Sequence, residues 1–245
     1  MGSKAVDPGA ILWYYIYDTQ TGRHCSVMRI TIEQVKANES IKSYIKKADE
    51  SLIALGYTEH SFPHVTKVSQ TAKKILLTLG YPERDAELAE IAGYLHDIGN
   101  VINRVDHAQS GAIMAFRLLD RMDAEPDEIA TIITAIGNHD ESTAFPVNPV
   151  AAALILADKT DVRCNRVRNT DLPRFDIHDR VNYSVKRSDV TVSGEEIVLD
   201  IDIDTGFCPV MDYFEIFLNR MILCRKAAEK LGIRFALIIN GQKMI

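Results

Sequence analysis

Apolar residues recur at intervals of three and four positions along the first two thirds of the chain, which is the spacing of amphipathic helices. Glycine and proline residues interrupt this pattern at points where helices commonly end or begin. The pattern predicts helices over residues 32–55, 63–79, 82–97, 107–119, 126–139 and 150–167. The first half of the last helix is apolar on all sides, so we expect that helix to be buried.

The pattern changes after residue 173, where apolar and polar residues alternate in the manner of β-strands, with Gly194 in the turn of a hairpin. The predicted order is strand, strand, helix and strand, over residues 183–192, 196–204, 209–231 and 234–239. The expected fold is therefore mainly α. It consists of a helical bundle over residues 28–172 and a small C-terminal α+β subdomain of ββαβ order over residues 173–245.

Residues 1–27 match neither a helical nor a clean strand period. We expect them to form an N-terminal extension, and Met28 is a candidate start of the native chain. An apolar run at residues 11–17 is too short to cross a bilayer and lacks the flanks of a signal peptide. No membrane association is therefore expected.

The composition, with 47% hydrophobic and 25% charged residues, is that of an ordinary soluble globular protein. A formal net charge of -6 gives no strong signal for nucleic-acid binding, so small molecules are the expected partners. The four cysteines lie far apart with no CxxC spacing, which argues against a zinc ribbon or a disulfide framework. This cysteine usage fits a reducing cytoplasm.

Histidines and aspartates gather at the ends of the predicted helices. His96 and Asp97 stand where a helix is ending, with Gly99 placed to end it, but alone such a pair is an ordinary helix terminus. Asp158 interrupts the buried helix, where a carboxylate is costly unless it is paired or binds a cation. The complete set of candidate metal ligands is His64, His96, Asp97, His107, His139 and Asp158. Such a mixture suits divalent Mn, Fe, Co, Ni or Zn better than calcium.

The order of His64, His96–Asp97 and Asp158 resembles the HD superfamily of metal-dependent phosphohydrolases, over about residues 58–168. This resemblance implies an all-helical, HD-type domain in which the four residues hold one metal ion. It also implies that His96 and Asp97 form part of the catalytic centre.

The two remaining histidines, His107 and His139, resemble the second-metal histidines of binuclear members of that superfamily. Asp97 would then bridge two ions, so the expected cofactor is one or two divalent transition metal ions. Two departures from the family are visible. Asn100 replaces a lysine that many members carry, and no GYP motif follows His139, which disfavours cyclic dinucleotide hydrolysis.

Positive charge for a substrate phosphate must therefore come from other positions. Lys159, Arg163 and Arg166 recur at helical spacing after Asp158 and predict a basic ridge, although a solvated helix face has the same pattern. Arg104, in the loop before His107, is a weaker candidate. Two further acids, at positions 140 and 161, either orient a ligand or face solvent.

The leading hypothesis is a metal-dependent phosphohydrolase that cleaves a phosphoester or phosphoanhydride of a small phosphorylated substrate, with a nucleotide as first candidate, by a metal-activated hydroxide. One alternative is a dinucleoside polyphosphate hydrolase. Another is a non-catalytic, nucleotide-responsive regulatory module, suggested by Asn100 and by the separate C-terminal subdomain. An apolar stripe at Tyr213, Phe214 and Phe217 either packs internally or buries the interface of a homodimer.

Overall fold

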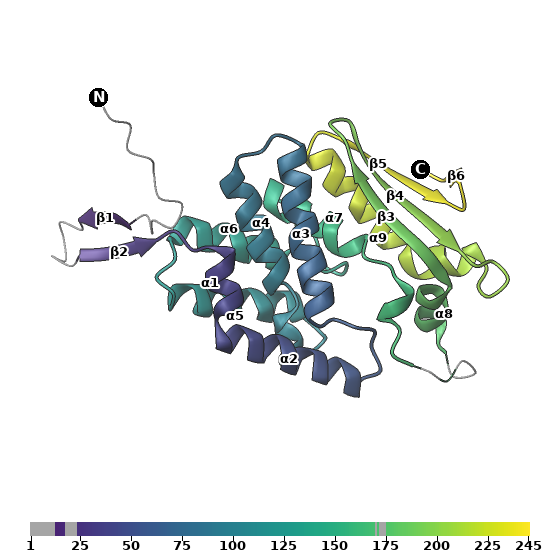
Figure 1. Cartoon of the computed structure of the whole chain (residues 1–245), viewed down its shortest axis with the longest axis horizontal. Coiled ribbons are helices and arrows are strands. Elements are labelled where there is room, and N and C mark those ends of the chain that lie inside the picture. Colours follow the sequence, from purple (N-terminus) through teal and green to yellow (C-terminus); the bar gives the residue numbers. More distant parts are fainter. Residues whose placement is uncertain (1–12, 18–23, 170, 172–174) are drawn as a thin grey trace, which may run out of the picture.

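The structure is a computed structural model that describes residues 13–17, 24–169, 171 and 175–245. In this part of the chain, helices form most of the molecule, and a four-stranded sheet lies toward the C-terminal end (Figure 1). The prediction of a mainly α fold with a small C-terminal α+β unit is confirmed. The boundaries placed at residues 28 and 173 stay predictions.

The helical body is arranged around one apolar helix, α7 (Pro149–Lys159). Its side chains from Val150 to Leu156 are almost completely buried, because α3, α4, α6 and α9 surround it. The other helices of the body are α1 (Ile32–Ala37), α2 (Glu39–Ala54), α3 (Phe62–Thr78), α4 (Glu83–Leu95), α5 (His107–Asp120) and α6 (Pro126–Gly137).

The first predicted helix, over residues 32–55, is wrong as a single element. The chain forms α1 and α2 instead, and Asn38 between them has an extended backbone with ψ of 116°. The Asn38 side chain accepts hydrogen bonds from the backbone N–H groups of Ser40 and Ile41. An asparagine that caps a new helix in this way competes with helix continuation.

The last predicted helix of the body, over residues 150–167, is also shorter than expected. Helix α7 ends at Lys159, and Arg166 belongs to a separate 3-10 turn, η2 (Cys164–Arg166). The Thr160 hydroxyl donates a hydrogen bond of 2.6 Å to the Leu156 carbonyl at the helix end. The expected basic ridge therefore does not exist as one helix face.

The C-terminal unit contains a sheet with the order β3-β4-β5-β6. Strands β3 and β4 form the predicted hairpin, and β5 pairs parallel to β4 after a crossover through the long helix α9. Helix α9 contacts both this sheet and α7 (Figure 1). The elements are α8 (Ile177–Ser184), β3 (Val185–Val192), β4 (Glu196–Ile203), α9 (Val210–Lys230), β5 (Arg234–Ile239) and β6 (Gln242–Lys243).

The sequence pattern predicted no element at helix α8 or at strands β1, β2 and β6. Helix α8 begins at an Asp176 side chain that accepts the N–H of Asp179, a capping signal in a segment without a clear apolar period. Strands β1 (Trp13–Tyr17) and β2 (His24–Met28) form an antiparallel pair within the expected N-terminal extension. A strand of five residues is too short for its alternation of apolar and polar residues to be recognised in the sequence.

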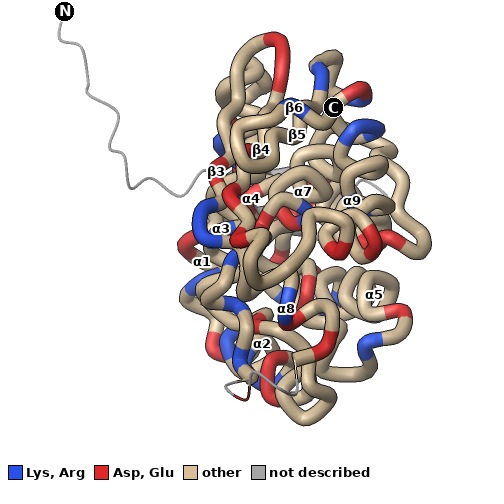
Figure 2. The backbone as a smooth tube through the Cα atoms, turned by 90° about the vertical axis from the view of Figure 1, so that its right-hand side faces the viewer, with Lys and Arg blue, Asp and Glu red and all other residues tan. Residues whose placement is uncertain are grey.

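Acidic and basic residues alternate over the backbone without a large region of one sign (Figure 2). Among the described helices, none combines the length and the apolar character needed to cross a bilayer.

The sequence predicts that Gly99 ends a helix, but in the structure this residue has a different role. It lies inside a short 3-10 helix, η1 (Ile98–Val101), which packs closely against the start of α5. A Cβ atom on Gly99 would come within 2.0 Å of the His107 carbonyl oxygen and 2.5 Å of the Gly111 nitrogen. The missing side chain thus lets η1 approach α5, and this approach brings Asp97 next to His107.

Replacing Gly99 with alanine is expected to lower the free energy of unfolding by at least about 2 kcal/mol, because both contacts are with backbone atoms that cannot turn aside. Chemical denaturation measures this change. Gly194→Ala is the matched control, since its added Cβ meets nothing within 4 Å. Equal stability of the two variants would contradict the close approach of η1 and α5.

Candidate metal centre

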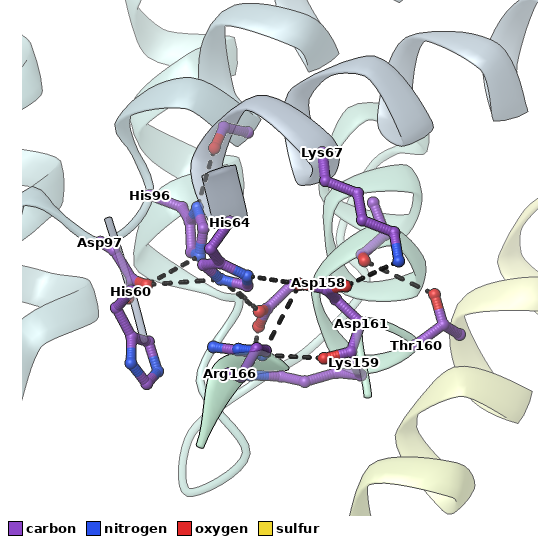
Figure 3. Close-up of polar contacts among 12 residues, drawn as sticks. His60, His64, Lys67, His96, Asp97, Asp158, Lys159, Thr160, Asp161 and Arg166 are labelled. Carbon is purple, nitrogen blue, oxygen red and sulfur yellow. Dashed lines mark hydrogen bonds and ion pairs between the residues drawn. The ribbon is translucent and has the colours of Figure 1, made fainter. Parts of the chain in front are cut away.

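Four side chains from three helices meet at the centre of the helical body (Figure 3). His64 lies in the first turn of α3, His96 and Asp97 follow α4, and Asp158 projects from α7. His64 Nε2 is 3.5 Å from Asp97 Oδ2 and 3.4 Å from Asp158 Oδ1. His96 Nε2 is 3.2 Å and 3.7 Å from the same two oxygens.

These distances fit the ligands of one metal ion. With metal–ligand bonds of about 2.0–2.2 Å, ligand atoms around a single ion lie roughly 3.0–3.5 Å apart. The four residues that the HD resemblance implied as ligands of one ion are therefore brought together.

Three of these atoms have no hydrogen-bond partner in the described part of the chain. They are His64 Nε2, His96 Nε2 and Asp97 Oδ2, and all three are buried. A buried polar atom without a hydrogen-bond partner destabilises the folded state, and three such atoms that face one another destabilise it further. One divalent cation would satisfy all three atoms, so the residues present fit a metal ion.

Three histidines of the site are oriented by the same kind of hydrogen bond. In His96, His107 and His139, the Nδ1 atom lies 2.6–2.9 Å from the backbone carbonyl of the residue three positions earlier. Those carbonyls belong to Gly93, Arg104 and Ile136. Because a carbonyl only accepts, Nδ1 carries the proton and Nε2 keeps its lone pair for a metal. The last carbonyls of a helix have no hydrogen-bond partner within the helix and can accept such bonds. This explains why His96 and His139 lie at the C-terminal ends of helices.

His64 is oriented differently, by the carboxylate of Asp161, whose Oδ2 atom is 2.8 Å from His64 Nδ1. Asp161 is 2% exposed, so the solvent-facing alternative for this residue is wrong. It is also surrounded by the cations of Lys67, Arg163 and Arg166. Burial raises the pKa of this carboxyl, but the contacts with His64 and Arg166 outweigh that effect and hold the pKa well below its usual range.

A second group of possible ligands adjoins the first. The His139 ring centroid is 5.0 Å from that of His96 and 5.1 Å from that of His107. Asp97 directs Oδ2 toward the first group, and its Oδ1 atom is 3.7 Å from His107 Nε2. Asp97 therefore lies between the two groups, as a bridging ligand would. The number of ions bound stays a prediction.

The protonation states of two histidines and of both carboxylates suit metal binding, whereas burial would lower the pKa of His96 but the adjacent Asp97 carboxylate raises it. Burial, reinforced by the charge of His96, lowers the pKa of His139 to about 3, and burial also lowers the pKa of His107. Both imidazoles are therefore neutral near pH 7. Burial alone would raise the pKa of Asp97 and of Asp158, but the neighbouring His96 and Lys159 respectively hold both pKa values well below the usual range. Both carboxylates are ionised.

Asn100, where the sequence departs from the pattern of the HD resemblance, is 2% exposed and contacts the candidate metal ligand Asp97. Its Nδ2 atom donates hydrogen bonds of 2.9 Å to Asp97 O and to Asp97 Oδ1. Its Oδ1 atom accepts a hydrogen bond from Arg104 at 3.3 Å. Asn100 thus orients the carboxylate, and its position gives it no free contact with a substrate phosphate.

The predicted phosphate-binding cations separate into two groups. Lys159 is buried, with Nζ 2.6 Å from Asp158 Oδ2, so it supports a metal ligand. Arg163 pairs with Asp161 at 2.7 Å and does not line the space around the metal ligands. Lys159, Arg104 and Arg166 line that space.

A larger cavity adjoins the ligand set. A chamber of about 20 Å³ is lined by His107, His139, Asp97 and Asp158, and a cavity of about 400 Å³ lies beside it. Four residues line both spaces: His60, Arg104, Arg166 and Arg220. The wall of the cavity is completed by residues 55–58 and by helices α8 and α9.

Sequence reasoning missed His60 and Arg220 as residues of the site. His60 adjoins His64, with ring centroids 5.4 Å apart, and it lies only four positions before it in the chain. Arg220 belongs to a helix expected to pack against the sheet or bury an interface. No local pattern could have placed it beside residues more than 60 positions away.

Asp161→Asn is expected to weaken metal binding by roughly 10-fold to 100-fold, because the amide no longer fixes the proton of His64 on Nδ1. Competition between the protein and a chelator of known affinity measures this effect. Asp120→Asn, at an exposed helix position, serves as the control. Unchanged affinity in Asp161→Asn would contradict the orienting role of this carboxylate.

Comparison with known proteins agrees with this arrangement. Residues 62–163 match the HD domain family. An uncharacterized protein of Methanocaldococcus jannaschii is 22% identical, over 72% of this chain and 76% of its own length. A crystal structure of a predicted HD superfamily hydrolase from an uncultured Thermotogales bacterium is 25% identical, covers 51% of this chain and 67% of its own chain, and gives a TM-score of 0.40. The segment that matches the HD domain family carries the buried His and Asp cluster.

Proposed function

We propose that this chain is a metal-dependent phosphohydrolase that cleaves a phosphoester or phosphoanhydride of a small phosphorylated substrate, and that the substrate is a nucleotide. The observation that carries this proposal is the pair of adjoining spaces. The cavity of about 400 Å³ shares Arg104 and Arg166 with the chamber of the metal ligands. An anionic group at the junction of the two spaces would meet both guanidinium groups and the ligand set together.

The residues of the chamber have separate tasks in such a reaction. His64, His96, Asp97 and Asp158 would hold a divalent ion, which would supply a Lewis acid and lower the pKa of water. Asn100 holds the carboxylate of Asp97 in place. Arg104 and Arg166 bind phosphate oxygens, and their fixed positive charge stabilises the charge that develops on the phosphoryl group.

The size of the cavity supports one nucleotide as the substrate. A volume of about 400 Å³ lies near the lower end of the range for small-molecule sites, about 300–1,000 Å³. We therefore favour a single nucleotide over a dinucleoside polyphosphate. Tyr57 in the wall offers an aromatic face, and Asp179 and Asn182 of α8 offer polar groups for a base or a sugar.

The regulatory alternative has lost its main motivation. It relied on Asn100 as a missing phosphate contact, but this side chain is engaged with Asp97. It also relied on a separate C-terminal subdomain, whereas α8 and α9 line the cavity. We therefore favour the enzyme.

Metal analysis followed by an activity screen tests the proposed function. The purified chain is expected to bind at least one transition metal ion and to release phosphate or a nucleotide product only in its metal-loaded form. Asp97→Ala is expected to abolish this turnover. A metal-loaded protein that is inactive toward all nucleoside monophosphates, polyphosphates and simple phosphodiesters would contradict the proposal.

Arg104→Gln is expected to lower kcat/KM by about tenfold or more, because a charge-assisted contact with the substrate phosphate is lost. Steady-state kinetics on the best substrate of the screen measures the change. Arg117→Gln is the control, since this arginine is exposed on α5. Equal kcat/KM values for the two variants would remove Arg104 from the phosphate site.

A further inference from the structure

Helix α9 contributes to the site although it lies outside the HD segment in sequence. The segment that matches the HD domain ends at residue 163, and α9 begins at Val210. Two side chains of α9, Phe217 and Arg220, nevertheless line the cavity of about 400 Å³. Arg220 also lines the small chamber, so its guanidinium lies at the junction of the two spaces.

Contacts with the protein hold Arg220 in place but leave part of its guanidinium accessible. Its Nε atom pairs with Glu141, and its guanidinium lies 4.7 Å from the centre of the Phe217 ring. The side chain is 26% exposed, so a ligand in the cavity can reach it. Glu141 is the one acidic partner that the described residues give to Arg220.

Among the described residues, Arg163 and Arg166 make more hydrogen bonds with the protein than Arg220 does. Arg163 directs Nε and Nη2 to the Asp161 carboxylate, and a third nitrogen to Asn165. Arg166 donates to the carbonyls of Glu59 and Asp161, which ties the η2 loop together. Since a guanidinium has five N–H donors, the single acidic partner of Arg220 leaves donors for a ligand.

Glu141 places this arginine close to the metal ligands. It follows shortly after His139 in the chain, and its Oε2 atom is 3.4 Å from Lys159 Nζ. That Nζ atom is 2.6 Å from Oδ2 of Asp158. Three successive ion pairs, through Glu141 and Lys159, therefore connect Arg220 to the candidate metal ligand Asp158.

We propose that Arg220 is a substrate-binding residue whose guanidinium binds the phosphate group of the substrate, so that the C-terminal unit completes the active site of the HD domain. The proposal rests on the proposed function, because it takes the ligand to be a phosphate ester. In the absence of substrate, Glu141 occupies the guanidinium. A phosphate then replaces this carboxylate, since the planar fork of arginine matches two phosphate oxygens.

Calorimetric titration of inorganic phosphate into the metal-loaded, full-length protein tests this role. Arg220→Gln is expected to weaken phosphate binding by about tenfold or more, while the metal content stays unchanged. Arg220→Lys is expected to fall between the wild type and Arg220→Gln, because charge is kept and the fork is lost. Arg225→Gln is the control, on an exposed face of the same helix, and should bind phosphate as the wild type does.

A second variant separates substrate binding from a structural ion pair. If Arg220 and Glu141 only tie α9 to the HD domain, Glu141→Gln and Arg220→Gln should have the same effect on phosphate affinity. If Arg220 binds phosphate, Glu141→Gln should tighten phosphate binding, because a competing negative charge is removed. Equal effects, or wild-type affinity in Arg220→Gln, would overturn the proposal.

The proposed function and this inference can fail separately. A metal-loaded wild type that does not bind phosphate overturns the role of Arg220. A wild type that binds phosphate through Arg220 but hydrolyses no phosphorylated compound supports the role of Arg220 and contradicts the enzyme. With an active enzyme, Arg220→Gln should raise KM for the substrate more than Arg225→Gln does, and unchanged KM would count against the proposal.

Discussion

The structure depends on one constraint, which is the burial of three polar atoms that face one another without protein partners. These atoms are His64 Nε2, His96 Nε2 and Asp97 Oδ2. A protein tolerates such a cluster only if a cation compensates it, and only if each side chain is held in one orientation. Much of the surrounding polar structure serves this second need, through carbonyls at helix ends, the carboxylate of Asp161 and the amide of Asn100.

The charges around this cluster are ordered by distance from it. Imidazoles and ionised carboxylates lie at the centre, where the pKa of His139 is lowered and that of His96 is raised by the neighbouring Asp97. Lys159 and Asp161 come next and hold individual ligands in position. Arginines that keep contact with a cavity form the outer layer, where an anionic group can enter. Under the proposed function, this order would let one small region attract a metal cation at its centre and a phosphate anion at its edge.

The C-terminal unit forms part of the wall around the candidate site. The ligands lie within the HD segment, but the space beside them is closed by α8 and α9. Helix α9 is able to reach the site because it packs on α7, which also carries Asp158.

The sequence by itself determined the helical body, the ββαβ order and the order of the candidate ligands. Helical and strand periods are local, and a buried charged residue such as Asp158 is conspicuous in an apolar helix. Only the tertiary structure decided which charges share the site. Arg220 lines the chamber of the candidate ligands, whereas Arg163 does not. The sequence could not show this, because the end of α7 and the packing of α9 depend on contacts between distant segments. The tertiary structure also showed Gly99 as a point of close approach, since the atoms it must avoid belong to another helix.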